Sequence, residues 1–453
     1  MEFFVLDLFC PGGGTGRRAG LKILFPATEV RVRFPSGAHI LAIMNDTPDH
    51  SSMTSLAIHG GYPDHAEHAH LLPIFASSTF TFDNAQQGMD RFSGKEPGYV
   101  YSRFANPTVR AAEELVAKLE AFGIAEKDGK PMELKALLHA SGQSAMATML
   151  LSNLSAGDTV LSHPSLYGGT YEFIYGLLPR FGIHSLIDDL KDMHRLDELI
   201  KKTPGLKLIH IETPANPTMG CIDLEAVCGV AVRHHIKVTV DNTFATPYLQ
   251  QPFRYGVDFV FHSTTKFLNG HGTSIGGVLI GKDLAFMNSR VYDTYKLLGA
   301  NSNPFDAFLL TQGIKTLGLR MDRHCDNAQR VAEFLADHPA VLKVHFNGLK
   351  SHADAALTQK QMRRAGAVLA FELKGGMKAG MQFIDKLRIC TRAVSVGTVD
   401  TLISHPASMS HSGMPAEDRH KAGVTDGLIR MSVGLESIED IIGDLRQAME
   451  GEE

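Results

Sequence analysis

The sequence is poor in cysteine, and its few cysteines are not closely paired. Five occur in 453 residues, and no Cys-x-x-Cys motif is present; they are Cys10, Cys221, Cys228, Cys325 and Cys390. An odd number of widely spaced cysteines argues against a disulfide framework and against a zinc ribbon. We therefore expect a reducing compartment, the cytoplasm, and no metal site.

The sequence also lacks an excess of positive charge and long apolar runs. Its formal net charge is −5, which argues against a nucleic-acid-binding surface. No apolar stretch reaches the roughly 18–20 residues of a membrane span. An apolar content of 44% in a chain of this length allows a large core and predicts two or three domains. The expected partner is a small molecule.

Residues 1–43 differ in composition from the rest of the chain. They contain five basic residues and show no clear periodicity. The segment resembles the peptide produced when a transfer-RNA gene is translated in frame with the gene downstream, so we expect a non-native or disordered extension and a start at Met44 or Met53. Two other interpretations stay open, a transit peptide and a dinucleotide fingerprint at Gly14-x-Gly16-x-x-Ala19.

From about residue 105 onward, strand-like apolar runs alternate with helical patterns. This alternation predicts a mostly parallel sheet with helices on both faces, and functional groups at the carboxyl ends of the strands. After about residue 300 the pattern predicts a long helix over 304–338, a strand over 367–373, helices over 376–387 and 437–449, and thus a second, α+β domain. The strands expected in the first domain are 136–139, 159–162, 206–212, 237–241, 259–262 and 277–280.

Lys266 follows a buried strand and three hydroxyl residues, Ser263, Thr264 and Thr265. Hydroxyls at a strand end can bind phosphate oxygens. A lysine that is partly desolvated beside them has a lowered pKa and can act as an amine nucleophile. The alternative is an ordinary turn with a solvated lysine.

Asp241 ends another apolar strand, over 237–241. A carboxylate there is costly unless a cation faces it, and a protonated pyridine nitrogen is such a cation. The alternative is a helix N-cap for the residues from Thr243 onward.

Two glycine-containing turns provide further candidate ligand contacts. Ser-Gly-Gln at 141–143 lies between a predicted strand and a helix, where backbone N–H groups and the helix dipole bind anions. Tyr167 precedes two glycines, so its ring is free to lie flat on a ligand ring. A close-packed turn and an ordinary core tyrosine remain as alternatives.

Together, these motifs resemble the Cys/Met-metabolism (trans-sulfuration) family of pyridoxal-phosphate enzymes, which has the aspartate-aminotransferase fold. The resemblance covers about residues 55–450. Its motifs are Tyr-Ser-Arg-Phe-Ala-Asn-Pro-Thr (101–108), Ser-Gly-Gln (141–143), Glu-Thr-Pro-Ala-Asn-Pro (212–217), Asp-Asn-Thr (241–243), Ser-Thr-Thr-Lys (263–266), Gly-Ile-Lys-Thr-Leu-Gly-Leu-Arg-Met (313–321), His-Pro-Ala-Ser-Met-Ser-His-Ser (405–412) and Gly-Leu-Ile-Arg-Met-Ser-Val-Gly-Leu-Glu (427–436).

The resemblance implies a fold and an assembly. The expected fold is a seven-stranded, mostly parallel sheet in a cofactor-binding large domain at 105–300, with a smaller α+β domain at 301–453. Residues 44–104 would form an arm that contributes to a neighbouring subunit. The expected assembly is a homotetramer, a dimer of dimers.

The resemblance also implies a role for each matching position, with pyridoxal 5'-phosphate as the cofactor. Lys266 would bind the cofactor covalently, Asp241 would pair with its pyridine nitrogen, and Tyr167 would stack on its ring and protonate the leaving group. Arg430 would bind the substrate carboxylate with Asn216 and Ser395. The phosphate would be held by Gly142, Gln143, Ser263 and Thr265, with Tyr101 and Arg103 supplied by the neighbouring subunit.

Within the family, the C-terminal half is most similar to methionine γ-lyases, which convert methionine to 2-oxobutyrate, methanethiol and ammonia. Val394 stands where cystathionine γ-lyases have a glutamate. Gly169 stands where methionine γ-lyases have a cysteine, which keeps open an O-acetyl- or O-succinylhomoserine sulfhydrylase or a cystathionine γ-synthase. A non-catalytic protein that binds pyridoxal phosphate is the alternative from another class.

Overall fold

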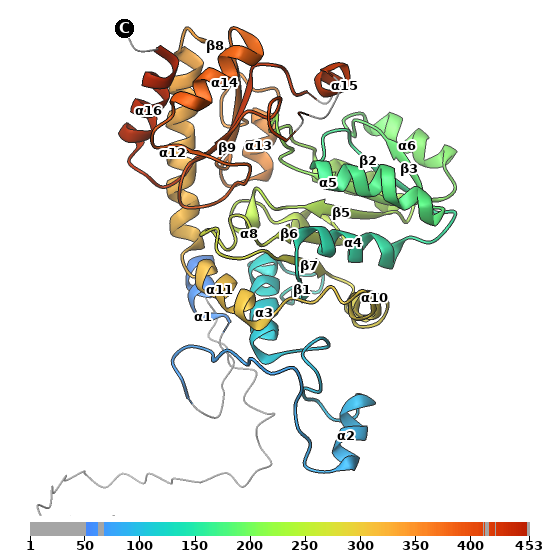
Figure 1. Ribbon diagram of the computed structural model, residues 1–453. Helices are drawn as coiled ribbons and strands as arrows, with labels where there is room; N and C mark the ends of the chain where they lie inside the picture. Colours follow the sequence, from blue (N-terminus) through green and yellow to red (C-terminus); the bar gives the residue numbers. More distant parts are fainter. Residues whose placement is uncertain (1–50, 62–67, 411, 413–415, 422, 451–453) are drawn as a thin grey trace, which may run out of the picture. The chain divides into compact units, whose positions relative to one another are not determined.

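The computed structural model describes residues 51–61, 68–410, 412, 416–421 and 423–450. The expectations for residues 1–43 and for the start of translation therefore lie outside the described residues. The described elements build two β-sheets with helices around them (Figure 1). One sheet comes from residues 135–281, and a smaller one comes from residues 341–432.

The larger sheet has seven strands, in the order β1-β7-β6-β5-β4-β2-β3. The pairs among β2 to β6 are parallel, whereas β7 runs antiparallel to both β1 and β6. The predicted mostly parallel seven-stranded sheet is therefore confirmed. Its strands are β1 (Lys135–His139), β2 (Thr159–Ser162), β3 (His184–Ile187), β4 (Leu206–Glu212), β5 (Lys237–Asp241), β6 (Phe259–Ser263) and β7 (Gly277–Gly281).

Both faces of this sheet are buried, as a sheet made of near-continuous apolar strands requires. Alternate residues of β6 face opposite sides, so that Phe259 and Phe261 pack in one cluster and Val260 packs in the other. Helix α4 (Gly142–Asn153) covers the first side with Met146 and Met149. Helices α3 (Pro107–Ala121) and α7 (Leu224–Arg233) cover the second side.

Shorter helices connect these elements. No helix in the described part of the chain is both long and apolar enough to cross a membrane. The connecting helices are α1 (Met53–His59), α2 (Ala85–Phe92), α5 (Gly168–Tyr171), η1 (Glu172–Leu177), η2 (Leu178–Phe181), α6 (Met193–Lys202), α8 (Thr246–Leu249), η3 (Pro252–Tyr255), α9 (Leu284–Phe286), η4 (Met287–Val291) and α10 (Tyr292–Leu298).

The smaller sheet belongs to the C-terminal domain and has the order β10-β11-β12-β9-β8. It is mostly antiparallel, and only β10 and β11 run parallel. Its strands are β8 (Val341–His345), β9 (Val368–Leu373), β10 (Thr391–Arg392), β11 (Leu402–Ser404) and β12 (Leu428–Ser432), and its helices are α12 (Leu317–Asp337), α13 (Ala355–Gln361), α14 (Gly376–Lys386), α15 (Ala416–Lys421) and α16 (Ile438–Glu450).

The prediction of one long helix over 304–338 is wrong, because two helices replace it. Helix α11 (Pro304–Ile314) ends before α12 begins at Leu317. The buried Arg320 explains the break, since its Nη2 donates to the Gly313 carbonyl (2.8 Å) and its Nη1 to the Phe267 carbonyl (2.8 Å). These bonds hold the end of α11 against the turn that carries Lys266, and the bond to Gly313 satisfies a carbonyl that a continuous helix would have used.

Strand β3 did not appear among the strands expected from the sequence. It lies at the edge of the sheet, and none of its four residues is buried. An edge strand without a buried face carries no apolar run, so hydrophobic periodicity gives no signal for it.

At the opposite edge of the sheet, a buried glutamate forms a hydrogen bond with the edge strand β1. Glu113 on α3 accepts a hydrogen bond from the Leu138 N–H of β1 (2.8 Å) and is 6% exposed. Burial raises the pKa of Glu113 to about 7, although Arg110, 3.9 Å away, opposes the shift. The protonated carboxyl therefore stabilises the fold fully below the unfolded pKa, and this contribution is lost as the pH rises through 7.

The Glu113→Gln variant should be more stable than the wild type at alkaline pH. Glutamine keeps the acceptor for Leu138 N–H but cannot ionise, so the difference in unfolding free energy should grow from near zero at pH 4.5 to about 3 kcal/mol at pH 8. Urea denaturation across this pH range measures it. The control is Glu114→Gln, on the half-exposed neighbour. Equal stability of wild type and variant at pH 8 would contradict the assignment.

Candidate active site

A cavity of about 880 Å³ opens at the carboxyl ends of β4, β5 and β6. This is where parallel α/β sheets bind ligands. Besides these strand ends, the cavity is lined by the start of α4, the segment around α5, the turn after β6, residues 394–396 and Arg430 of β12. No three His, Cys, Asp or Glu side chains within the described ranges are grouped so as to hold a metal ion.

Lys266 lies in the turn after β6 and faces this cavity. Its Nζ donates a hydrogen bond to Ser395 Oγ (2.8 Å), which fixes the position of the amine. Burial lowers the pKa of Lys266, and the positive charge of Arg430 lowers it further. A larger fraction of the amine is therefore neutral and nucleophilic near neutral pH.

Asp241 ends β5 and also lines the cavity. Its Oδ1 accepts hydrogen bonds from Thr243 N (3.0 Å) and Thr243 Oγ1 (2.5 Å), and Thr243 Oγ1 in turn accepts from Ser263 N (2.9 Å). Burial raises the pKa of Asp241, against the effect of the two bonds from Thr243. The N-cap alternative fails, because the next helix, α8, starts at Thr246 after the N-cap residue Ala245.

The start of α4 forms a narrow cradle beside the turn after β6. Ser141 is the N-cap of this 12-residue helix, and a capping box joins it to Ser144. A Cβ at position 142 would lie 2.8 Å from the Cβ of Ser263, so only glycine fits there. Because the first-turn N–H groups of a helix lack partners within the helix, they can bind an anion held beside Ser263 and Thr265.

Tyr167 lies at the side of the cavity, and 57% of it is exposed. Its loop is held close to α4, because Gln143 Nε2 donates to the Gly169 carbonyl (2.9 Å). A Cβ at position 169 would lie 2.8 Å from Tyr167 Cε1 and 2.9 Å from Gln143 Oε1. Any larger residue at position 169 would therefore displace the tyrosine ring or the Gln143 side chain.

Arg430 extends from β12 of the smaller sheet into the same cavity. Its Nη2 donates to the Val394 carbonyl (2.7 Å), and its Nη1 lies 3.5 Å from Asn216 Oδ1. Burial lowers the pKa of Arg430, against the effect of Tyr167. A guanidinium fork beside an amide and the hydroxyl of Ser395 can bind a carboxylate.

Ten of the twelve site residues expected from the sequence line this single cavity. They are Gly142, Gln143, Tyr167, Asn216, Asp241, Ser263, Thr265, Lys266, Ser395 and Arg430. Tyr101 and Arg103 do not line it. Arg103 instead donates from Nη1 to the Lys296 carbonyl (2.8 Å) and lies over the ring of Phe104 (4.8 Å). The individual roles of all twelve stay predictions.

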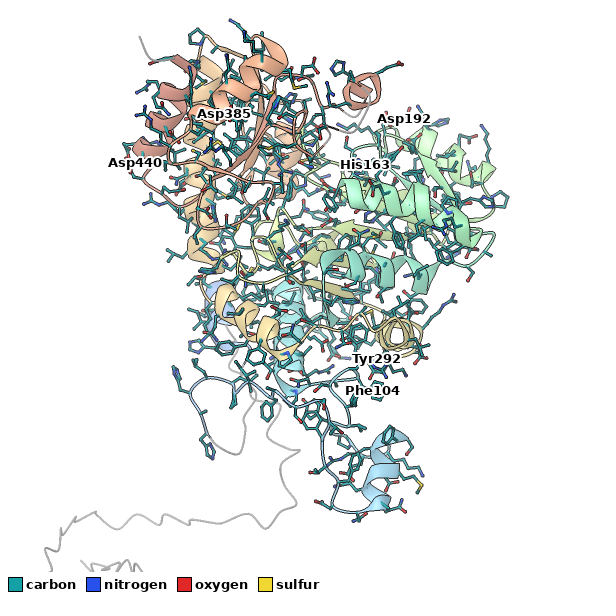
Figure 2. All side chains as sticks on the ribbon, viewed as in Figure 1. Phe104, His163, Asp192, Tyr292, Asp385 and Asp440 are labelled. Atoms are coloured by element: carbon teal, nitrogen blue, oxygen red, sulfur yellow. The ribbon has the colours of Figure 1, made fainter. Side chains whose placement is uncertain are left out.

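The segment that contains Arg103 is joined to residues much later in the same chain. Tyr292, at the start of α10, donates from its hydroxyl to the carbonyl of Phe104 (3.2 Å), and Figure 2 labels both residues. Asn106 caps α3 and also donates to the Phe75 carbonyl (2.8 Å). Residues 104 and 106 are therefore held in place by contacts within their own chain.

The sequence interpretation missed Glu212, which is buried and lines the cavity. It ends β4 directly beside Asp241 in the register of the sheet. Burial raises the pKa of Glu212 to about 8, and the neighbouring Asp241 carboxylate raises it as well. The sequence signal that could have identified Glu212 is the one that identified Asp241, an acidic residue at the end of an apolar strand.

The Gly142→Ala variant should bind pyridoxal 5'-phosphate about 10- to 100-fold more weakly, because the added methyl group must displace Ser263. Fluorescence titration of the cofactor-free protein measures this. Gly229→Ala is the matched control, since a Cβ on this exposed α7 residue meets nothing within 4 Å. Unchanged cofactor affinity in Gly142→Ala would contradict the proposed cradle.

Comparison with known proteins shows where the chain belongs. Residues 54–450 match the family model described as Cys/Met metabolism PLP-dependent enzyme. The L-methionine γ-lyase of Porphyromonas gingivalis is 42% identical over 401 residues, which cover 88% of this chain and 97% of the relative. The O-succinylhomoserine sulfhydrylase of Pseudomonas aeruginosa is 36% identical over 399 residues, which cover 88% and 95%.

A solved structure gives the same result for the fold. The cystathionine γ-synthase of Xanthomonas oryzae pv. oryzae, in complex with aminoacrylate and cysteine, superposes with a TM-score of 0.80 at 36% identity, and the match covers 88% of this chain and 97% of that chain. The aspartate-aminotransferase type of fold expected from the sequence is confirmed. The chain belongs to the family of Cys/Met-metabolism enzymes and depends on pyridoxal 5'-phosphate.

Proposed function

We propose that this chain catalyses the γ-elimination of methionine to 2-oxobutyrate, methanethiol and ammonia. One observation carries the proposal. The Lys266 amine, the Asp241 carboxylate and the Arg430 guanidinium line a single cavity in a chain that is 42% identical to an L-methionine γ-lyase. An amine, a buried acid and a carboxylate-binding fork are the groups that this elimination requires from a protein.

The residues of the cavity fit pyridoxal 5'-phosphate. The start of α4, with Ser263 and Thr265, would hold the phosphate, and Asp241 would keep the pyridine nitrogen protonated. When bound, the cofactor supplies an electron-accepting ring that stabilises negative charge on the carbon next to the amine. The supporting observations are the partly buried Asp241, the tight approach of Gly142 to Ser263, and the lowered pKa of Lys266.

The protein groups would then bind the substrate and move protons. Arg430 and Asn216 would hold the substrate carboxylate, which fixes the direction of the bond from Cα to its hydrogen. The Lys266 amine, aligned by Ser395, would take the proton from Cα and return it at a neighbouring carbon. The Tyr167 hydroxyl would protonate the departing sulfur, which makes the thiol a better leaving group.

A second candidate is a homoserine-ester sulfhydrylase or synthase, in which a thiol adds to the same four-carbon skeleton. Gly169 favours it, because methionine γ-lyases are expected to have a cysteine at this position. A Cβ at position 169 would lie 2.8 Å from Tyr167 Cε1, so a cysteine there would require the Tyr167 ring to shift. The P. aeruginosa sulfhydrylase shows that this activity occurs among relatives of the chain.

The non-catalytic alternative has less support. Loss of Lys266, Asp241 or Arg430 would be the simplest route to an inactive relative, and all three line the cavity. A protein that only binds the cofactor also has no need for a carboxylate-binding fork at the cofactor's side.

We propose further that the enzyme is cytoplasmic and that it is a homotetramer, assembled as a dimer of dimers. Each subunit would have a large domain at 105–300 and a small domain at 301–453. Residues 44–104 would form an arm that contributes to the neighbouring subunit. Support for the shared assembly comes from Tyr101, which is 40% exposed and lies outside the cavity of its own chain.

Support for the cytoplasmic location comes from the cysteines. The four cysteines of the described residues are all buried and free, as in proteins of a reducing compartment.

The choice between lyase and sulfhydrylase is testable with a substrate panel. Methionine, homocysteine, cystathionine, O-acetylhomoserine and O-succinylhomoserine are supplied with and without sulfide, and 2-oxobutyrate and homocysteine are measured. We expect 2-oxobutyrate from methionine without sulfide, and a loss of at least about 1,000-fold in Lys266→Ala, because a proton carrier is removed. The exposed Lys207 provides the control, Lys207→Ala.

Two results of this panel would contradict the proposal. Homocysteine formed only from an ester plus sulfide would establish the sulfhydrylase, and no turnover of any compound by the cofactor-loaded protein would favour the non-catalytic alternative.

A mixing experiment tests the shared active site. Arg103→Ala and Lys266→Ala should each be inactive alone. Random mixing makes half of the dimers hybrids with one intact site, so a co-expressed mixture should regain about one quarter of wild-type activity. Steady-state assay of the purified mixture measures this recovery. If the mixture stays as inactive as its components, Arg103 does not act across the subunit boundary.

A further inference from the structure

Glu212 links three parts of the cavity that are far apart in the sequence. Its Oε2 accepts a hydrogen bond from the Tyr167 N–H (2.6 Å), and its Oε1 accepts one from the Asn216 N–H (3.1 Å). Across the sheet, Glu212 pairs in register with Asp241. One carboxylate thus contacts the main chain of two predicted ligand-binding residues and lies beside a third.

The backbone of Glu212 is also fixed. Its N–H donates to His163 Nε2 (3.0 Å), and His163, labelled in Figure 2, directly follows β2. Burial lowers the pKa of His163 to about 4, so the ring stays neutral and Nε2 remains an acceptor near neutral pH. The position of the Glu212 side chain is therefore set by β4, by β5 and by the end of β2.

The carboxylate is unlike the other buried acids near the sheet. Glu120 faces His262 (2.6 Å) and Glu113 faces Arg110 (3.9 Å), whereas Glu212 forms no ion pair with a basic side chain of the described residues. Its neighbours are instead two backbone N–H groups and a second carboxylate. Burying an acid against another acid costs stability, so a functional requirement is the natural explanation.

The hydrogen bonds identify that requirement. Both oxygens of Glu212 accept bonds from main-chain groups, so the side chain holds the backbone rather than facing a ligand with a free oxygen. Tyr167 precedes the short helix α5, whose N-terminus has no side-chain cap of its own. Glu212 supplies a carboxylate there, while Gln143 holds the same loop through Gly169.

We propose that Glu212 is a positioning residue that keeps the Tyr167 loop and the Asn216 loop at a fixed separation, so that one ligand meets the tyrosine ring on one side and the carboxylate-binding group on the other. This inference rests on the proposed function, which assigns the ring contact to Tyr167 and the carboxylate contact to Asn216. The Nη1 atom of Arg430 lies 3.5 Å from Asn216 Oδ1. Because Glu212 holds Asn216, it also positions Arg430.

Glu212→Gln tests this role. Glutamine offers one acceptor oxygen, and its NH2 group then faces the other backbone N–H. Amide hydrogen exchange at Tyr167 or Asn216, measured residue by residue in cofactor-loaded protein, should therefore quicken by about 10- to 100-fold. The affinity for methionine, followed through the visible absorption of the bound cofactor, should weaken about 10-fold or more.

Asp444→Asn is the matched control. Asp444 on α16 is also buried, at 4% exposed, and accepts bonds from the N–H groups of Arg388, Ile389 and Cys390, but it lies outside the cavity. This variant should lose stability without any change in exchange at Tyr167 and Asn216 or in methionine affinity. If Glu212→Gln does not fold, Glu212→Asp, which keeps the charge but is too short to bridge both loops, should show the same two effects.

The outcomes separate the inference from the proposed function. Wild-type exchange at both amides together with wild-type methionine affinity in the Glu212 variants overturns the positioning role. Neither readout requires turnover, so a protein that fails to convert methionine can still show the faster exchange at Tyr167 and Asn216. In that case the positioning role holds while the proposed γ-lyase activity does not.

Discussion

The parallel register of β4, β5 and β6 is the constraint on which the site depends. It places Glu212 beside Asp241 and Asp241 beside Phe261, which lies two residues before the three hydroxyl residues that precede Lys266. Side chains alternate along a strand, so a shift of one residue would turn Asp241 or Glu212 to the opposite face of the sheet. The buried apolar residues of these strands prevent such a shift, and the core thereby fixes the chemistry at its edge.

The cavity also gathers charges whose burial must be compensated. Two acids, Glu212 and Asp241, line the same cavity as Lys266 and Arg430. Burial raises the pKa of both acids and lowers that of Lys266, so each charged form is costly until a ligand of complementary charge is present. A pyridinium nitrogen would supply that complementarity to Asp241, and a substrate carboxylate would supply it to Arg430.

The smaller domain completes the site. Ser395 and Arg430 belong to the C-terminal part of the chain, and Ser395 binds the Lys266 amine directly. Arg320, which follows the break between α11 and α12, also joins the C-terminal part of the chain to the turn of Lys266. It donates hydrogen bonds both to the end of α11 and to the residue after Lys266. Residues that bind the substrate carboxylate and residues that bind the cofactor thus come from different sheets, and their separation depends on how these two parts pack.

The sequence by itself determined which strand ends carry the functional groups. Apolar strands ending in Asp241 and in the hydroxyl turn before Lys266 predicted both the parallel sheet and the ligand edge, because periodicity and local chemistry are written in neighbouring residues. Only the tertiary structure decided what depends on distant contacts. It broke the helix expected over 304–338 through Arg320, added the exposed edge strand β3, and showed that Glu212 joins Tyr167 to Asn216. The bonds of Arg320 and the bond between Glu212 and Tyr167 join residues 7 to 53 positions apart, and β3 has no buried face, so none of these features leaves a local pattern.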